Sequence, residues 1–153
     1  MNLVRKNKVI KEVMECNIPC FTIVRNPWER AVSSWKWCML KKGLPLSEFE
    51  DFLRMPFDKM TEQQRFHSSP QYPHVVDESG CTDYLDHIGR LESIHDTCIW
   101  IESILGGVFK HKLDHLKKTE HVHYTEYYTE STKNLVFTKF RRDIEYFGYE
   151  FGS

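Results

Sequence analysis

The hydrophobic and polar positions of the first 42 residues predict a helix, a short strand and a second helix. Over residues 2–15, apolar residues recur at helical spacing among Lys, Arg and Glu, which is typical of an amphipathic helix. Residues Phe21–Val24 are apolar or β-branched, as in a short strand covered on both faces. A helix should follow to about Lys42, because Asn26 can cap it and Pro27 suits its first position.

The middle of the chain shows a weaker pattern. Residues 48–55 are expected to form a short helix that begins after the cap residue Ser47. Residues 56–81 are the least regular, and they include an expected loop over Arg65–His74 that contains the pair Pro70–Gln71. A long loop in a compact domain is more often functional than idle, and a surface excursion with packed aromatic side chains is the plain alternative.

Strand and helix signals return in the last part of the chain. Residues 83–92 are expected to form a second strand and turn, followed by a helix that ends at Gly106. Residues 110–124 form a basic, His-rich loop without periodicity, and a last helix is expected over residues 131–146. These elements predict an α/β fold with a small parallel sheet flanked by helices. A length of 153 residues suits a single domain with a real core.

Composition restricts the classes of partner. The net charge is −1, so the chain as a whole has no attraction for nucleic acid or an anionic membrane, and any anion site must be local. The sequence contains no apolar run that approaches the length of a membrane span. The five Cys residues lack disulfide-rich spacing, which predicts reduced thiols and a cytoplasmic location; a lumenal fragment of a Golgi-type enzyme is the alternative.

The sharpest local signal is the block from Arg25 to Ser33, where a strand ends and a helix begins. In open α/β sheets phosphates bind at this place, because unpaired N–H groups and the helix dipole attract anions. Arg25 is expected to end the strand, and helical spacing puts Arg30 and Ser33 on the same face as the cap Asn26. Two guanidinium groups and a hydroxyl should therefore converge on one anion. An ordinary strand–turn–helix with a surface Arg is the plain alternative.

The sequence Arg25-Asn26-Pro27-x-x-Arg30-x-x-Ser33 resembles the 3′-phosphate-binding motif of sulfotransferases that use 3′-phosphoadenosine 5′-phosphosulfate (PAPS). The likeness is greatest to the carbohydrate sulfotransferases, and it extends more weakly over residues 15–151. It implies a P-loop-like sulfotransferase core, PAPS as co-substrate without a metal, and a carbohydrate hydroxyl as acceptor. It also implies that Arg25 and Ser33 hold the 3′-phosphate, while Arg30 matches a second Arg with a less uniform role.

The sequence departs from the family pattern in the residues that hold the 5′-phosphosulfate and in the catalytic base. The family's cradle for the 5′-phosphosulfate is a Lys-x-Gly-x-Thr turn well upstream, whereas 24 residues precede Arg25 here and residues 1–17 contain no Gly. No His precedes His67, which becomes the first choice for a catalytic base, approaching the acceptor from the Pro–Gln loop. We therefore expect a core truncated at its N-terminus, or reduced, with little or no transfer activity by these 153 residues alone.

Two rival readings stay open. A non-catalytic module that binds a nucleotide or a sulfated glycan would explain the missing cradle. A metal site is the weaker rival, because no Cys-x-x-Cys is present and no His or Cys pair completes a zinc spacing. The pairs considered were His111 and His115, His121 and His123, Cys16 and Cys20, and His95 with Asp96.

Overall fold

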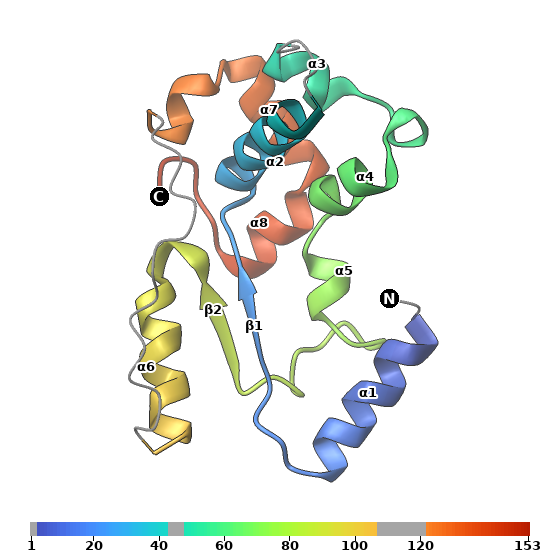
Figure 1. Ribbon diagram of the computed structural model, residues 1–153, viewed down its shortest axis with the longest axis vertical. Coiled ribbons are helices and arrows are strands. Elements are labelled where there is room, and N and C mark those ends of the chain that lie inside the picture. The colour runs from blue at the N-terminus through green and yellow to red at the C-terminus, as the bar shows by residue number, and fades with distance from the viewer. Residues whose placement is uncertain (1–2, 43–47, 107–121) are drawn as a thin grey trace. The chain divides into compact units, whose positions relative to one another are not determined.

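The computed structural model describes residues 3–42, 48–106 and 122–153 (Figure 1). The chain forms two compact units, each made from two segments of the sequence. The first unit comprises Met1–Arg25 and Tyr72–Lys118, and the second comprises Asn26–Gln71 and Thr119–Ser153. The division falls between Arg25 and Asn26, inside the block that the sequence marks as a phosphate site.

The first unit contains a small parallel sheet with helices around it, as the sequence predicts. Strand β1 pairs with β2, and their register runs from Phe21 opposite His87 to Val24 opposite Arg90. Figure 1 shows the two strands side by side, with α6 next to β2. The elements are α1 (Leu3–Glu15), β1 (Phe21–Val24), α5 (Tyr72–Val75), β2 (His87–Arg90), the 3-10 turn η2 (Leu91–Ser93) and α6 (Ile94–Ile104).

The expectation that β1 is covered on both faces is wrong. Phe21 and Ile23 are each 42% exposed, while Val24 at the end of the strand is buried. Residues two apart on a strand point to the same face, so Phe21 and Ile23 share a face that the described elements cover only in part. The apolar run alone predicts a strand, but it does not report how many layers cover it.

Helix α6 lies close against β2 at one glycine. A Cβ atom added to Gly89 would stand 2.0 Å from Oγ1 of Thr97, a distance no side chain tolerates. Thr97 is buried, and its hydroxyl lies 3.1 Å from Nε2 of His87. Glycine at this position thus lets the strand and the helix approach each other closely.

The second unit is helical and is built around α2 (Pro27–Lys42), the helix predicted after the cap. Its apolar side chains Trp28, Ala31 and Val32 are buried, and Trp35 is half-buried against the rings of Phe49 and Tyr127. The other elements are α3 (Phe49–Arg54), η1 (Phe57–Lys59), α4 (Glu62–Ser68), η3 (Tyr124–Tyr127), α7 (Glu130–Lys139) and α8 (Arg141–Phe147).

Two expectations for this unit need correction. The segment expected as a loop over Arg65–His74 is largely helical. It contains the end of α4, which Thr61 and Gln64 start with a capping box, and the start of α5 in the first unit. The single helix expected over residues 131–146 is two helices, since Phe140 leaves helical geometry with φ −115° and ψ 25°. Neither Gly nor Pro marks this break, so the periodicity does not reveal it.

Some expectations fall outside the described residues. These concern the basic loop over residues 110–121. The cap expected at Ser47 is wrong, because Glu48 is the N-cap residue of α3. The predicted first helix is confirmed as α1, and the stop at Gly106 is confirmed by its left-handed φ of +63°. Among the described helices, none combines the length and the apolar character needed to cross a bilayer.

Candidate functional site

The start of α2 is fixed by the side chain of Asn26, which is fully buried. Its Oδ1 accepts a hydrogen bond from the backbone N–H of Trp28 at 3.0 Å, which confirms the predicted cap. Its Nδ2 donates to the backbone oxygen of Glu150 at 3.0 Å and lies 3.4 Å from the hydroxyl oxygen of Tyr124. One side chain therefore caps α2 and ties it to the C-terminal segment of the same unit.

Two aromatic side chains, Tyr128 and Trp28, form further hydrogen bonds that hold the first turn of α2. The hydroxyl of Tyr128 donates to the backbone oxygen of Trp28 at 2.8 Å, and the indole N–H of Trp28 donates to the backbone oxygen of Lys133 at 3.2 Å. Burial raises the pKa of Tyr128 above its ordinary value, with a smaller contribution from nearby Tyr124. These bonds hold the first turn of α2 in one orientation, so the faces of the helix have defined surroundings.

Ser33 and Arg30 both lie on α2, as predicted. Ser33 is half-buried, and its hydroxyl has no hydrogen-bond partner within the part of the chain that the structure describes. Arg30 is half-buried, and its Nη1 donates to the backbone oxygen of Ser69 at 2.6 Å. Ser33 thus offers an uncommitted hydroxyl, whereas Arg30 spends part of its bonding capacity on the segment after α4.

Arg25 follows β1 directly and is half-buried. The strand itself ends one residue earlier, at Val24, which pairs with Arg90 of β2. Arg25 is the last residue of the first segment of the first unit, while Arg30 and Ser33 belong to the second unit. The convergence of these three side chains on one anion therefore stays a prediction from their spacing.

His67 lies in the last turn of α4 rather than on a loop. Its ring packs against the ring of Trp37 at an interplanar angle of 43°, with 4.1 Å between the centroids, and its backbone oxygen accepts a hydrogen bond from Oγ of Ser34 at 2.9 Å. Together with the bond from Arg30 to Ser69, this contact joins α2 to the end of α4. The backbone at the end of α4 is thereby held against the helix that carries Ser33.

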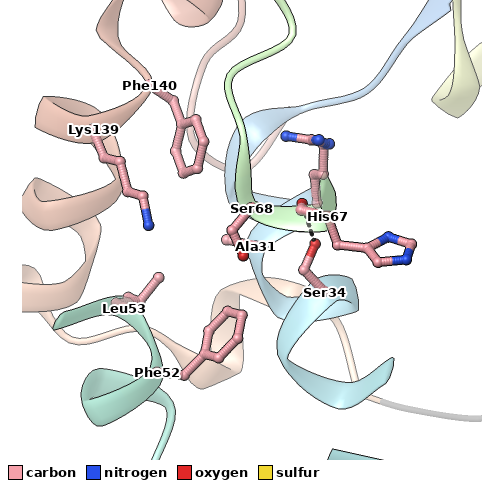
Figure 2. A pocket seen from close by; sticks show the side chains of 9 residues that line it. Ala31, Ser34, Phe52, Leu53, His67, Ser68, Lys139 and Phe140 are labelled. Atoms are coloured by element: carbon pink, nitrogen blue, oxygen red, sulfur yellow. Dashed lines mark hydrogen bonds between the residues drawn. The ribbon is translucent and has the colours of Figure 1, made fainter. Parts of the chain in front are cut away.

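Arg30 and His67 line a common pocket in the second unit (Figure 2). Three further polar residues of this pocket, Ser34, Ser68 and Lys139, are not predicted from the sequence. Ser68 adjoins His67, but Lys139 comes from α7, more than 70 positions further along the chain. No short motif links the two, so the sequence offered no signal for this cluster.

The described residues hold no group of three His, Cys, Asp or Glu side chains arranged to bind a metal ion. Of the pairs considered from the sequence, His111, His115 and His121 lie outside the described residues.

A model of the sulfotransferase family matches residues 1–150 of the chain. The match spans the sheet, α2 and the block from Arg25 to Ser33. No curated protein and no solved structure matches the chain.

Proposed function

Because the chain belongs to the sulfotransferase family, we propose that it binds PAPS through the 3′-phosphate and that it transfers sulfate to a carbohydrate hydroxyl or descends from proteins that do. The observation that carries this proposal is the position of the block Arg25–Ser33. Arg25 follows the buried end of β1. The uncommitted hydroxyl of Ser33 lies on α2, which begins at Pro27, two residues after Arg25.

The residues of this block fit a phosphate. A guanidinium offers a planar fork to two phosphate oxygens, and a hydroxyl donates one further bond. The N-terminal end of α2, a helix of 16 residues, adds the partial positive charge of its dipole. In this proposal Arg25 and Ser33 bind the 3′-phosphate. Arg30 is the third candidate for this site, and its bond to Ser69 also supports α4.

Sulfate transfer places specific demands on the rest of the site. The acceptor oxygen forms a bond to sulfur while the bond from sulfur to the bridging oxygen of the donor breaks, and a base takes the acceptor proton. We propose His67 for this base. Its ring packs on Trp37, and its backbone oxygen is held by Ser34, so both the ring and the backbone are constrained.

The location proposed for the chain is the cytoplasm. None of the five cysteines, all within the described residues, forms a disulfide. This is the state expected of thiols in a reducing compartment.

The test is incubation of the purified chain with PAPS labelled in its sulfur atom and a panel of glycan acceptors. We expect donor binding with little transfer, because residues 1–17 contain no Gly with which a backbone could wrap the phosphosulfate. Binding without turnover supports a nucleotide-binding module, and robust transfer that His67→Ala abolishes supports a complete active site. Absence of both binding and transfer contradicts the proposal.

A further inference from the structure

The pocket shared by Arg30 and His67 is a small hollow in the second unit. Its walls come from α2, α3, α4 and α7, and its volume is about 10 Å³. This volume holds roughly one particle the size of a water molecule. The apolar part of the wall is formed by Phe52, Leu53, Phe140 and Ala31.

One wall carries a buried hydroxyl without a partner. Ser68 is 4% exposed, and its Oγ has no hydrogen-bond partner among the described residues. A hydroxyl that leaves water without finding a partner costs free energy, and native proteins seldom keep such a group without a reason. The unsatisfied hydroxyl therefore indicates that a further species belongs in this pocket.

The opposite wall carries an ammonium group without a counter-ion. Lys139 is half-buried, and within the described parts of the chain it forms neither a salt bridge nor a hydrogen bond. Its Nζ lies over the ring of Phe140, 5.6 Å from the centroid. Burial lowers the pKa of Lys139, as expected for a cation that leaves water uncompensated. Figure 2 shows its side chain directed from α7 toward the part of the pocket where Ser68 lies.

We propose that this pocket binds one small inorganic anion of halide size, held by the ammonium of Lys139 and the hydroxyl of Ser68. An anion accepts from both donors and also neutralises the buried charge, whereas a water molecule leaves that charge unbalanced. The described lining residues favour a negatively charged ligand, because they include Arg30, His67 and Lys139 but no carboxylate. Space for roughly one water-sized particle fits a halide better than a sulfate or phosphate group.

The first test measures thermal unfolding in sodium chloride, sodium bromide, sodium sulfate and sodium gluconate at equal ionic strength. A bound anion stabilises the folded state in proportion to ln(1 + [anion]/Kd), so chloride should raise the midpoint of the wild-type chain above its value in gluconate. Lys139→Met should abolish this difference, and Ser68→Ala should reduce it. Lys133→Met is the matched control on the same helix, because Lys133 pairs with Glu130 outside the pocket, and it should keep the wild-type difference.

Sulfate stabilises many proteins without a site, so its effect is compared between the wild type and Lys139→Met. Equal sulfate effects in both chains agree with a halide-sized site, while a sulfate effect lost in Lys139→Met overturns the size assignment. Equal midpoints in chloride and gluconate for the wild type overturn the proposal altogether.

A second measurement does not depend on the folding of a variant. Trace acetylation of the wild-type chain, read by mass spectrometry, reports the reactivity of each amine. Chloride should slow acetylation of Lys139 several-fold and leave that of Lys133 unchanged. If chloride leaves both rates unchanged, the pocket is not an anion site. Neither experiment uses a nucleotide, so its outcome is independent of the proposed PAPS site.

Discussion

The side-chain amide of Asn26 donates a hydrogen bond to the backbone oxygen of Glu150, with 3.0 Å between the two atoms. The same side chain accepts the backbone N–H of Trp28 through Oδ1. Asn26 is fully buried, so both bonds form away from water. The residue that starts α2 thus also fixes the C-terminal segment, and the orientation of the helix that carries Ser33 depends on both ends of the unit.

We expect Asn26→Ala to destabilise the chain by about 2–4 kcal/mol, because it removes a helix cap and leaves buried groups without partners. Asn26→Ser is the matched variant, since Ser also caps helices but cannot reach the C-terminal segment with an amide. It should recover about 1 kcal/mol of the loss. Urea unfolding measures both values. The cap would be dispensable if the free energy of unfolding of Asn26→Ala differed from that of the wild type by less than about 0.5 kcal/mol, the effect of a neutral surface change.

Gly89 should not tolerate a side chain. Gly89→Ala forces a Cβ atom against Oγ1 of Thr97, and overpacking of this kind costs about 1–3 kcal/mol. Thr97→Ala removes the clashing hydroxyl and methyl, so the double variant should be more stable than the sum of the single effects predicts. A double-mutant cycle in urea provides the coupling energy. If the two changes in the free energy of unfolding are strictly additive, Gly89 and Thr97 are not in contact.

The burial of Tyr128 predicts a loss of stability at alkaline pH. Its folded pKa lies above the ordinary value of 10.0, so above about pH 10 the unfolded chain releases a proton that the folded chain retains. The contribution of Tyr128 is therefore complete below pH 10 and declines as the pH rises further, by at most about 1.4 kcal/mol per pH unit.

The measurement compares urea unfolding of the wild type and Tyr128→Phe between pH 8 and pH 11. Tyr128→Phe loses the bond to Trp28 at every pH, but its stability should fall less steeply above pH 10. Tyr146→Phe, at an exposed tyrosine of α8, controls for loss of a phenol from the surface. Parallel curves for the wild type and Tyr128→Phe would show that the buried phenol does not titrate as predicted.

Arg25→Lys should not be a conservative change. An ammonium is a point charge, while the guanidinium of Arg25 offers two parallel donors to phosphate oxygens. Affinity for adenosine 3′,5′-bisphosphate should fall measurably, whereas the melting temperature should barely move. Calorimetry and a thermal scan of the same preparation give both quantities. If Arg25→Lys binds the bisphosphate as tightly as the wild type, recognition by a bidentate Arg is wrong.

Local signals in the sequence were sufficient for α1, β1 and α2. Asn26 and Pro27 mark the start of α2 through preferences of neighbouring residues, so no knowledge of the rest of the fold is needed. The start of α4 was also readable, since Thr61 and Gln64 have the spacing of a capping box. It was missed because prolines and aromatic residues further along suggested a loop.

Long-range relationships could not be predicted. Glu150 meets Asn26 across 124 positions, and nothing in either local sequence specifies the other. The exposure of Phe21 and Ile23 depends on how many elements cover the sheet, which an apolar tetrapeptide does not encode. Lys139 reaches its pocket because α7 packs against α2 and α3, a result of the whole unit's packing.

The central claim is that Arg25 and Ser33 bind a 3′-phosphate, and calorimetry with two nucleotides tests it most directly. The wild type should bind adenosine 3′,5′-bisphosphate more tightly than adenosine 5′-monophosphate, because a charge-assisted bond to phosphate is worth about 1.5–3 kcal/mol. Arg25→Ala should lower the affinity for the bisphosphate about tenfold or more, and Ser33→Ala should lower it less, with little effect of either on the monophosphate. Equal affinities of the wild type for the two nucleotides would contradict the claim.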